Sequence, residues 1–199
     1  MKRVIVVVLG LAVAFGQVPQ SKVSNDSKVQ QQQNKVELTE YQLQQHKIIA
    51  LIKKLAEPYG LAETITVIAR IESNFGLYVV NLNEGSCGIT QINIKTYIAR
   101  HKIENTPFNR NKACSDLVNS MELSIANSIE ELLYWKQQFC NKATGECTKR
   151  QFQNVVRAYN GGFKGYKNKK TAEYWEKFKA YHKELYPAEL KTNFKQRQK

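Results

Sequence analysis

Apolar side chains recur at helical spacing through most of the chain after residue 40. They fall three and four positions apart, which is typical of the buried face of an amphipathic helix. Five stretches show this spacing: 48–59, 62–73, 116–139, 149–160 and 174–185. Pro58 with Gly60 ends the first helix, and Gly161 with Gly162 ends the fourth. The pattern therefore predicts a chain in which helices dominate.

The stretch 76–93 lacks this helical spacing. Gly85 and Gly88 interrupt it, and its apolar runs are too short for long strands. We expect loop and short extended pieces here. No internal repeat is visible in the 199 residues, and this length favours one domain with tails. The sequence thus predicts a mainly α, single-domain fold over residues 41–186 with one short β or loop segment.

Glu72 interrupts the apolar stripe of the second predicted helix. Ile65, Ile68 and Glu72 fall on one face of that helix. Burying a carboxylate beside apolar side chains is costly, because the charge loses its water. A lone Glu near a helix end is ordinarily a solvated surface charge, so a chemical role depends on what accompanies it.

Three short motifs follow one another around this glutamate. The first is IESNF at 71–75, the second GITQIN at 88–93 and the third AYNGG at 158–162. Each motif alone is a weak signal, whereas the three in this order are specific. Together they resemble the lysozyme-like lytic transglycosylases of the SLT family over roughly residues 45–165. The segment VNLNEGSCGITQIN at 80–93 is similar in more detail to the small specialised transglycosylases of secretion and conjugation machines and of phages.

The resemblance implies a lysozyme-like α+β fold in which the short β segment lies beside an active-site cleft. It also implies cleavage of the MurNAc–GlcNAc β-1,4 bond of peptidoglycan with a 1,6-anhydromuramic product. Glu72 is then the general acid and the general base, and no cofactor is needed. Burial against apolar neighbours raises a carboxyl pKa, which keeps such an acid protonated near neutral pH. In this family the N-acetyl group of the substrate stabilises the intermediate, so a second carboxylate is not obligatory.

The resemblance further implies a set of substrate-binding residues: Ser73, Ser86, Gly88, Thr90, Gln91, Tyr159 and Asn160. Gly88 lets the backbone bend or approach a sugar closely. Gln91 carries a donor and an acceptor, and Tyr159 offers a hydroxyl to the glutamate or the substrate. The Tyr159 ring also fits packing in the core, and Asn160 also fits a helix cap. Thr90 departs from the family, which usually has a hydrophobic residue before the Gln, so we expect a weaker sugar contact there.

The sequence is compatible with three other functions. A goose-type, lysozyme-like hydrolase needs a second acid, for which Glu84 is available, although Gly85 and Ser86 beside it favour a solvated turn. A non-catalytic protein that binds the cell wall is the second alternative, and the intact Glu72 and Gln91 argue against it. The third is an amphipathic basic membrane binder, which does not require the order of motifs.

Four cysteines allow three disulfide pairings, and the sequence alone does not decide among them. Cys140 and Cys147 bracket a turn-rich stretch, so we expect a bridge that closes this short loop. Cys87 and Cys114 then form the second pair, which joins the glutamine motif to a later segment. No paired C-x-x-C spacing is present, and the histidines are scattered at His46, His101 and His182. This pattern argues against a metal site and against a catalytic thiol.

The first 16 residues have the pattern of a secretory signal peptide. Two basic residues precede an uncharged, mostly apolar run of 12 residues at 4–15, and small residues at Ala12, Ala14 and Gly16 offer cleavage sites. This run is shorter than the ~20 residues that span a bilayer, so we expect cleavage and no transmembrane span in the mature protein. Residues 17–40 are rich in Gln, Ser, Asn and Lys, which predicts a disordered linker. We therefore expect an exported protein, periplasmic or extracellular, with disulfides formed in an oxidising compartment.

The formal net charge is +13, and residues 149–199 hold 14 Lys and Arg against 4 Asp and Glu. Such a surface attracts polyanions, which include nucleic acid, anionic lipid and the acidic polymers of a bacterial wall. We interpret residues 187–199 as a solvated basic tail and expect no specific nucleic-acid partner. The expected partner is the glycan strand of peptidoglycan, and the motifs leave a secretion, conjugation or phage assembly open as a second partner.

Overall fold

The structure is a computed structural model that describes residues 38–187. The predicted signal segment 1–16, linker residues 17–37 and tail residues 188–199 lie outside the described residues. One compact unit begins at Gln44, and the architecture below is that of this unit. None of the helices within the described range combines the length and the apolar content needed to cross a membrane.

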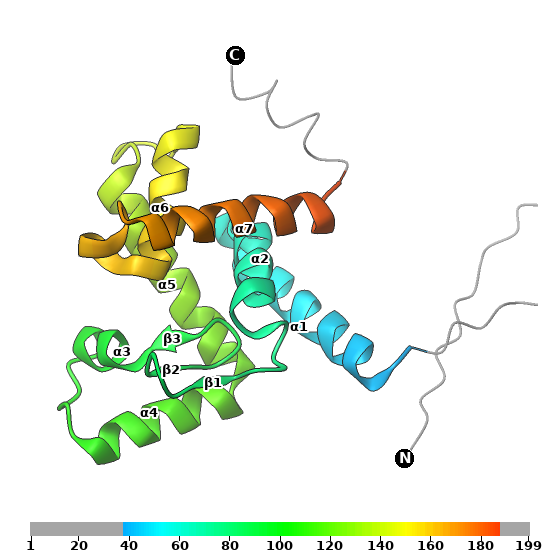
Figure 1. The fold of residues 1–199 in the computed structure, drawn as a ribbon, viewed down its shortest axis with the longest axis vertical. Helices are drawn as coiled ribbons and strands as arrows, with labels where there is room; N and C mark the ends of the chain where they lie inside the picture. Colours follow the sequence, from blue (N-terminus) through cyan, green and yellow to red (C-terminus); the bar gives the residue numbers. More distant parts are fainter. Residues whose placement is uncertain (1–37, 188–199) are drawn as a thin grey trace, which may run out of the picture. The chain divides into compact units, whose positions relative to one another are not determined.

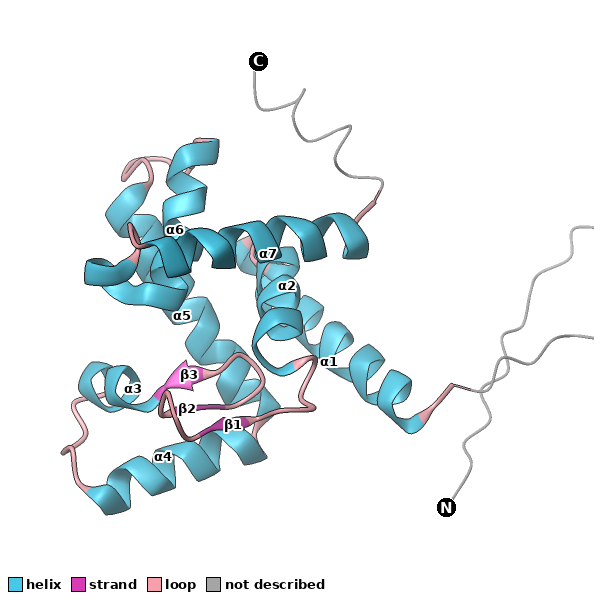
Figure 2. Cartoon of the chain, viewed as in Figure 1, coloured by secondary structure: helices cyan, strands magenta, loops and turns pink. Residues whose placement is uncertain are grey.

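Helices form most of the described chain, and a small sheet interrupts them (Figures 1 and 2). The helices, of which η1 is a 3-10 helix, are α1 (Glu40–Ala56), η1 (Glu57–Tyr59), α2 (Ala62–Ser73), α3 (Ile94–Arg100), α4 (Pro107–Asn119), α5 (Met121–Phe139), α6 (Lys149–Gly165) and α7 (Lys169–Leu185). The strands are β1 (Val80–Asn81), β2 (Ser86–Cys87) and β3 (Ile92–Asn93). This composition confirms the predicted mainly α, lysozyme-like fold with a short β segment.

Side-chain caps set where several of the helices begin. Thr106, Ser120 and Thr148 each accept a hydrogen bond from the backbone N–H three residues later, so each begins a helix. Thr148 and Gln151 form a reciprocal capping box. Because Ser120 caps α5, the single helix predicted for 116–139 is divided there into α4 and α5. The apolar spacing continues across the break, and this continuity is why the pattern alone missed it.

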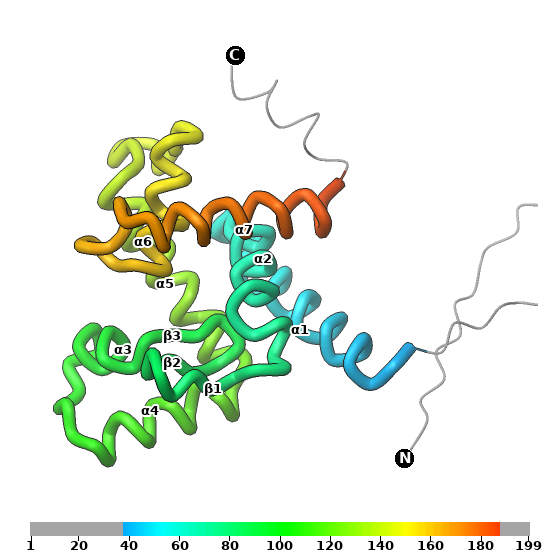
Figure 3. Tube along the Cα trace, in the orientation of Figure 1, coloured from blue at the N-terminus to red at the C-terminus, as the bar shows by residue number. Residues whose placement is uncertain are grey.

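The three strands form an antiparallel sheet in the order β1-β2-β3. Val80 pairs with Cys87 across the first turn, and Cys87 pairs with Ile92 across the second. Gly85 adopts a left-handed conformation with φ of 62° in the turn between β1 and β2. The sheet therefore carries the glutamine motif in its second turn, between β2 and β3, and Figure 3 follows the chain through this segment.

Two hydrophobic clusters fill the unit. The larger cluster joins buried residues of α1, α2, α5, α6 and α7, and the smaller one joins β2, β3, α3 and α4. Tyr159 on α6 packs against both clusters, so this side chain lies where the two cores meet. Helix α2 packs on α7, and α5 extends from α4 and the sheet to α6. This arrangement gives two lobes that share the segment around the glutamine motif.

Two disulfides fix the ends of the smaller elements. Cys87 is bonded to Cys114, which ties β2 to α4, and Cys140 is bonded to Cys147 between α5 and α6. This is the pairing that the turn-rich stretch between Cys140 and Cys147 suggested. No free cysteine occurs among the described residues.

Candidate active site

Glu72 lies in the last turn of α2, where the chain changes direction sharply. Asn74, Phe75 and Gly76 follow it with φ values of 50°, 56° and 82°, all in the left-handed region. Such a conformation costs a non-glycine residue about 1–2 kcal/mol, so packing must maintain it. Phe75 is 1% exposed in the larger core. The burial of this ring holds the helix end that presents Glu72.

Ser73 joins the end of α2 to the glutamine motif. Its hydroxyl donates to the carbonyl oxygen of Ile89 at 2.6 Å and accepts from the backbone N–H of Gly76 at 2.8 Å. The side chain is 1% exposed, so its atoms are occupied within the protein. The structure therefore gives Ser73 a role in joining the glutamate and glutamine motifs.

Glu72 and Gln91 line one open pocket of about 430 Å³. Its other lining residues are Tyr78, Val80, Asn81, Leu82 and Asn83, which come from β1 and the loops beside it. Tyr78 and Leu82 are 66% and 87% exposed. Exposed apolar side chains beside asparagine amides suit the faces and hydroxyls of a sugar chain. Glu72 is the single acidic residue in this lining.

The environment of Glu72 keeps its carboxyl protonated to unusually high pH. The pKa of Glu72 rises from 4.5 to about 7, mainly because of burial; Tyr174 and Lys177 oppose this rise, and the nearby Glu84 charge adds to it. The residue as a whole is half-buried, because it lies on the floor of an open pocket with its carboxyl desolvated. A carboxyl with a pKa of about 7 can both give and take a proton at neutral pH.

The hydroxyl of Tyr174 on α7 lies beside the carboxyl of Glu72. The ring is 7% exposed in the larger core, and its hydroxyl interacts with the Glu72 carboxyl. The contact falls short of full hydrogen-bond geometry. Burial, followed by the nearby negative charge of Glu72, raises the pKa of the Tyr174 hydroxyl. Tyr174 therefore stays a neutral donor beside the carboxyl.

The Gln91 amide has its nitrogen hydrogen-bonded and its oxygen unpaired among the described residues. Nε2 donates to the carbonyl oxygens of Tyr78 at 3.0 Å and Gly88 at 3.1 Å. Oε1 is buried and accepts no hydrogen bond from the part of the chain that the structure describes. Gln91 thus lines the pocket of Glu72 while its amide oxygen stays buried and unpaired within residues 38–187.

Thr90 faces the interior and not the pocket. Its side chain is fully buried and is hydrogen-bonded to the hydroxyls of Ser124 and Ser128 on α5. The Tyr159 hydroxyl donates to the Thr90 carbonyl oxygen at 2.9 Å. Tyr159 is near enough to Glu72 for the carboxylate charge to raise the pKa of its hydroxyl, after the larger effects of burial and Glu131. Tyr159 therefore lies near the candidate site, and its hydroxyl is hydrogen-bonded to the loop that carries the glutamine motif.

The remaining residues expected at the substrate divide between the interior and the surface. Ser86 is buried in β2. Gly88 has a φ of 87°, and a Cβ there would lie 2.6 Å from Ser124 Oγ, so this position excludes a side chain. Asn160 is exposed on α6. Of the expected residues, Gln91 shares the pocket with Glu72, and Asn160 has its side chain open to solvent.

Glu84, the second acid considered above, is paired across the sheet edge. Its carboxylate contacts Lys170 Nζ at 3.0 Å, and the two side chains are 55% and 79% exposed. Asn81 Nδ2 also approaches the carboxylate at 3.5 Å. The pair joins the β1–β2 turn to the beginning of α7. Glu84 affects Glu72 electrostatically but does not line its pocket.

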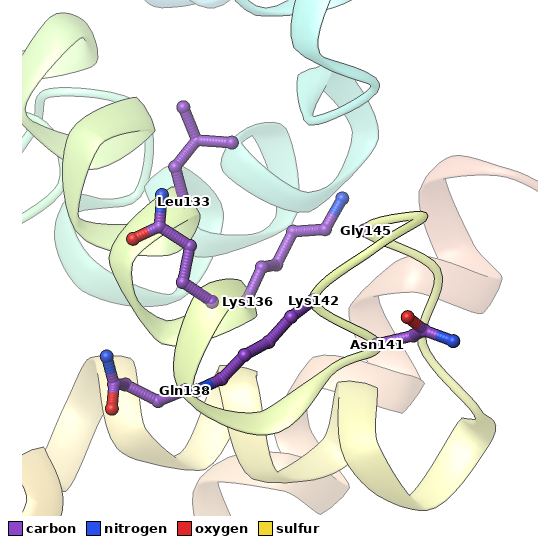
Figure 4. Close-up of a pocket in the computed structure, with 7 residues that line it drawn as sticks. Leu133, Lys136, Gln138, Asn141, Lys142 and Gly145 are labelled. Carbon is purple, nitrogen blue, oxygen red and sulfur yellow. The ribbon is translucent and has the colours of Figure 1, made fainter.

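A second groove lies at the far end of α5 (Figure 4). It is lined by Leu133, Lys136, Gln137, Gln138, Asn141, Lys142 and Gly145. Two ammonium groups and no carboxylate face it, so it lacks the groups for acid–base cleavage. Within residues 38–187, no cluster of three His, Cys, Asp or Glu side chains is placed to hold a metal ion.

The sequence reasoning missed Tyr174, Lys177, Tyr78 and Leu82. Tyr174 belongs to a helical apolar stripe, and its position beside Glu72 follows from the packing of α7 on α2. The alternation of Tyr78, Val80 and Leu82 was a visible signal, because apolar residues two apart in an extended segment share one face. Their exposure beside the pocket became evident only in the folded chain.

A comparison with protein-family models matches the transglycosylase SLT domain over residues 50–182. Searches of curated proteins and of solved structures each found no significant match. The family match covers two thirds of the chain and contains all three motifs. The chain therefore belongs to the transglycosylase SLT domain family, the lysozyme-like lytic transglycosylases that act on peptidoglycan.

Proposed function

We propose that Glu72 is the general acid and then the general base in cleavage of the MurNAc–GlcNAc β-1,4 bond, with a 1,6-anhydromuramic product. The observation that carries this proposal is that Glu72 is the one carboxyl lining the pocket, where burial raises its pKa to about 7. A protonated carboxyl can supply the proton that the leaving oxygen needs. Once ionised, the same group can accept a proton from the substrate.

The proposed reaction has two proton transfers and uses no water. Glu72 gives its proton to the bridging oxygen as the C1–O bond breaks, and the substrate's N-acetyl group stabilises the positive charge at C1. The Glu72 carboxylate then takes the proton of the muramic C6 hydroxyl, and O6 bonds to C1. Atoms and charge balance, and Glu72 ends protonated as it began. The neutral Tyr174 hydroxyl beside Glu72 lowers the pKa of that carboxyl and is placed to donate to the carboxylate once it forms, which would stabilise the ionised intermediate.

The proposed substrate contacts come from the exposed wall of the pocket. Tyr78 and Leu82 offer apolar area to sugar faces, and Gln91 lines the same pocket beside the asparagine amides. Asn160 is exposed and available as a further contact from α6. We propose that the buried Ser73, Ser86, Gly88 and Thr90 and the Tyr159 hydroxyl shape the loop and do not contact the sugar directly.

Hydrolysis with Glu84 as a second carboxylate is the alternative reaction. Glu84 lies near enough to raise the pKa of Glu72, which is the observation in its favour. Its pairing with Lys170 and its absence from the pocket lining favour the transglycosylase reaction. The two mechanisms use different nucleophiles, O6 of the substrate or water, and so give products of different mass.

Digestion of purified peptidoglycan followed by mass spectrometry tests the proposal. Anhydromuropeptides lack one water, about 18 Da, relative to hydrolysis products. We expect anhydro products from the native protein and from Glu84→Gln. We expect almost none from Glu72→Gln, since general acid–base catalysis contributes about 100- to 10,000-fold.

Other outcomes identify the alternatives. Products with a reducing end, together with an inactive Glu84→Gln variant, mean that the protein is a hydrolase. Binding to intact wall without any product means that it is a wall-binding protein. Glu130→Gln on α5 is a matched control, because Glu130 is an exposed glutamate outside the pocket lining. Its activity should equal that of the native protein.

We further propose that the protein is exported and meets the wall in the periplasm or outside the cell. An SLT domain acts on the cell wall, and the sequence pattern of residues 1–16 supports a cleaved signal peptide. The likeness of segment 80–93 to specialised transglycosylases supports work alongside a secretion, conjugation or phage assembly.

A further inference from the structure

Gln91 holds an unusual backbone conformation next to the catalytic carboxyl. Its φ is 51°, in the left-handed region that non-glycine residues seldom adopt. Its N–H donates to the Gly88 carbonyl oxygen at 3.1 Å, which closes the turn. A rotation of the peptide unit between Thr90 and Gln91 would relieve the conformation, so this unit must be held by other contacts.

Two helices hold that peptide unit from different sides. From α6, the Tyr159 hydroxyl donates to the carbonyl oxygen of Thr90 at 2.9 Å. From α5, Ser128 Oγ donates to Thr90 Oγ1 at 2.6 Å, and Ser124 Oγ lies 3.1 Å from the same atom. Both the carbonyl and the side chain of Thr90 are therefore fixed.

The four hydroxyl groups form one connected cluster. Ser128 Oγ also lies 3.3 Å from the Tyr159 hydroxyl and 3.0 Å from the Ser124 carbonyl oxygen. Ser124, Ser128 and Thr90 are fully buried. Because a hydroxyl in this interior has no water to replace a lost partner, removal of one member weakens the hydrogen bonding of the others. We call Thr90, Ser124, Ser128 and Tyr159 the hydroxyl cluster.

We propose that Ser124 and Ser128 of α5 are positioning residues for the reaction proposed above. The hydroxyl cluster fixes the backbone of Gln91, which lines the same pocket as Glu72. In this backbone conformation, Gln91 Nε2 donates to the carbonyl oxygens of Tyr78 and Gly88. Thr90, at the position where the family usually has a hydrophobic residue, is thereby the link between α5 and the site.

The test is a double-mutant cycle between Ser128→Ala and Gln91→Ala, read as kcat and KM on soluble glycan strands of defined length. We expect Ser128→Ala to lower kcat/KM about fivefold or more, as loss of one buried hydrogen bond permits. In the Gln91→Ala background the same change should have almost no further effect, because its effect passes through Gln91. Equal losses in both backgrounds overturn the proposal. Ser115→Ala, an exposed serine on α4, is the control for removal of a hydroxyl.

A conservative pair gives a second measurement at Thr90. Thr90→Val keeps the shape and removes the hydroxyl, whereas Thr90→Ser keeps the hydroxyl. Thr90→Val should lose several times more activity than Thr90→Ser, and the reverse order contradicts the proposal. If Ser128→Ala does not fold, Tyr159→Phe on α6 replaces it in the cycle with the same expected non-additivity.

An NMR measurement separates failure of this inference from failure of the proposed function. The Gln91 side-chain NH2 donates two hydrogen bonds, so its hydrogens should exchange slowly with solvent in the native protein. Ser128→Ala should speed this exchange severalfold, whether or not the protein cleaves glycan. An unchanged exchange rate means that the hydroxyl cluster does not position Gln91.

Discussion

The raised pKa of Glu72 predicts that the active site lowers the stability of the fold at neutral and alkaline pH. The carboxyl titrates near 4.5 when the chain is unfolded and at about 7 when it is folded. Between these values the folded state binds more protons than the unfolded state, so the free energy of unfolding falls as pH rises. Below 4.5 both states are protonated and the effect is absent. Above 7 it reaches its full size.

The magnitude follows from the size of the shift. Each pKa unit corresponds to about 1.36 kcal/mol, so a rise from 4.5 to about 7 gives roughly 3 kcal/mol as an upper value. Because the residue is only half-buried, we reduce this to about 2 kcal/mol. Glu72→Gln keeps the shape of the side chain and cannot ionise. It should therefore be more stable than the native protein at pH 8.5 by about 2 kcal/mol more than at pH 5.

Urea unfolding of both proteins at pH 5, 6, 7 and 8.5 measures this difference, and in thermal melts it corresponds to roughly 4–8 °C. Glu84→Gln is the control from the same region, because removing an exposed, paired carboxylate changes stability by less than about 1 kcal/mol. A stability difference between Glu72→Gln and the native protein that stays constant from pH 5 to 8.5 would refute the reasoning. The carboxyl would then titrate alike in both states.

Four further predictions rest on other contacts. In the proposed mechanism, cleavage of peptidoglycan should decline as pH rises through about 7, because Glu72 then loses the proton that it would donate. A pH–rate profile that is flat from 6 to 9 contradicts this. Gly88→Ala should lower the free energy of unfolding by about 2 kcal/mol or more, because its Cβ would lie 2.6 Å from Ser124 Oγ. Gly85→Ala meets no atom within 4 Å and should lose only about 1 kcal/mol to backbone strain, so urea unfolding should show it to be the more stable variant. Replacing both cysteines of the Cys87–Cys114 bridge by alanine should cost about 3–4 kcal/mol, and the same change at Cys140–Cys147 about 2–3 kcal/mol, because the first bridge closes the longer loop, 27 against 7 residues. The opposite order of stabilities in guanidinium unfolding would contradict this chain-entropy explanation. Arg100→Met should lower the free energy of unfolding by about 2–4 kcal/mol at pH 7, because the buried Glu131 then lacks the cation that lies 3.3 Å away. Adding Glu131→Leu should recover most of this stability, and a double variant as unstable as the single one would contradict the prediction.

The local pattern of the chain was sufficient for most of the helices. Periodic apolar positions and the stop at Pro58 and Gly60 predicted the first two helices, and the structure has them at Glu40–Ala56 and Ala62–Ser73. The same kind of signal failed at Ser120, where a hydroxyl caps a new helix within an unbroken apolar pattern. Caps depend on one side chain and its local geometry, so a periodicity that averages over many residues does not detect them.

The candidate site shows the same difference between what the sequence predicts and what only the folded chain reveals. The sequence by itself determined the family and indicated the candidate residues, because the Glu, Gln and Tyr motifs are local strings with a recognisable order. Only the tertiary structure decided what each of these residues touches. The packing of α7 on α2 brings Tyr174 to Glu72, and the packing of α5 and α6 on the glutamine loop turns Thr90 and the Tyr159 hydroxyl inward. The physical reason is that burial, and with it the pKa of Glu72, is a property of atoms supplied by distant segments, which the order of residues along one segment does not contain.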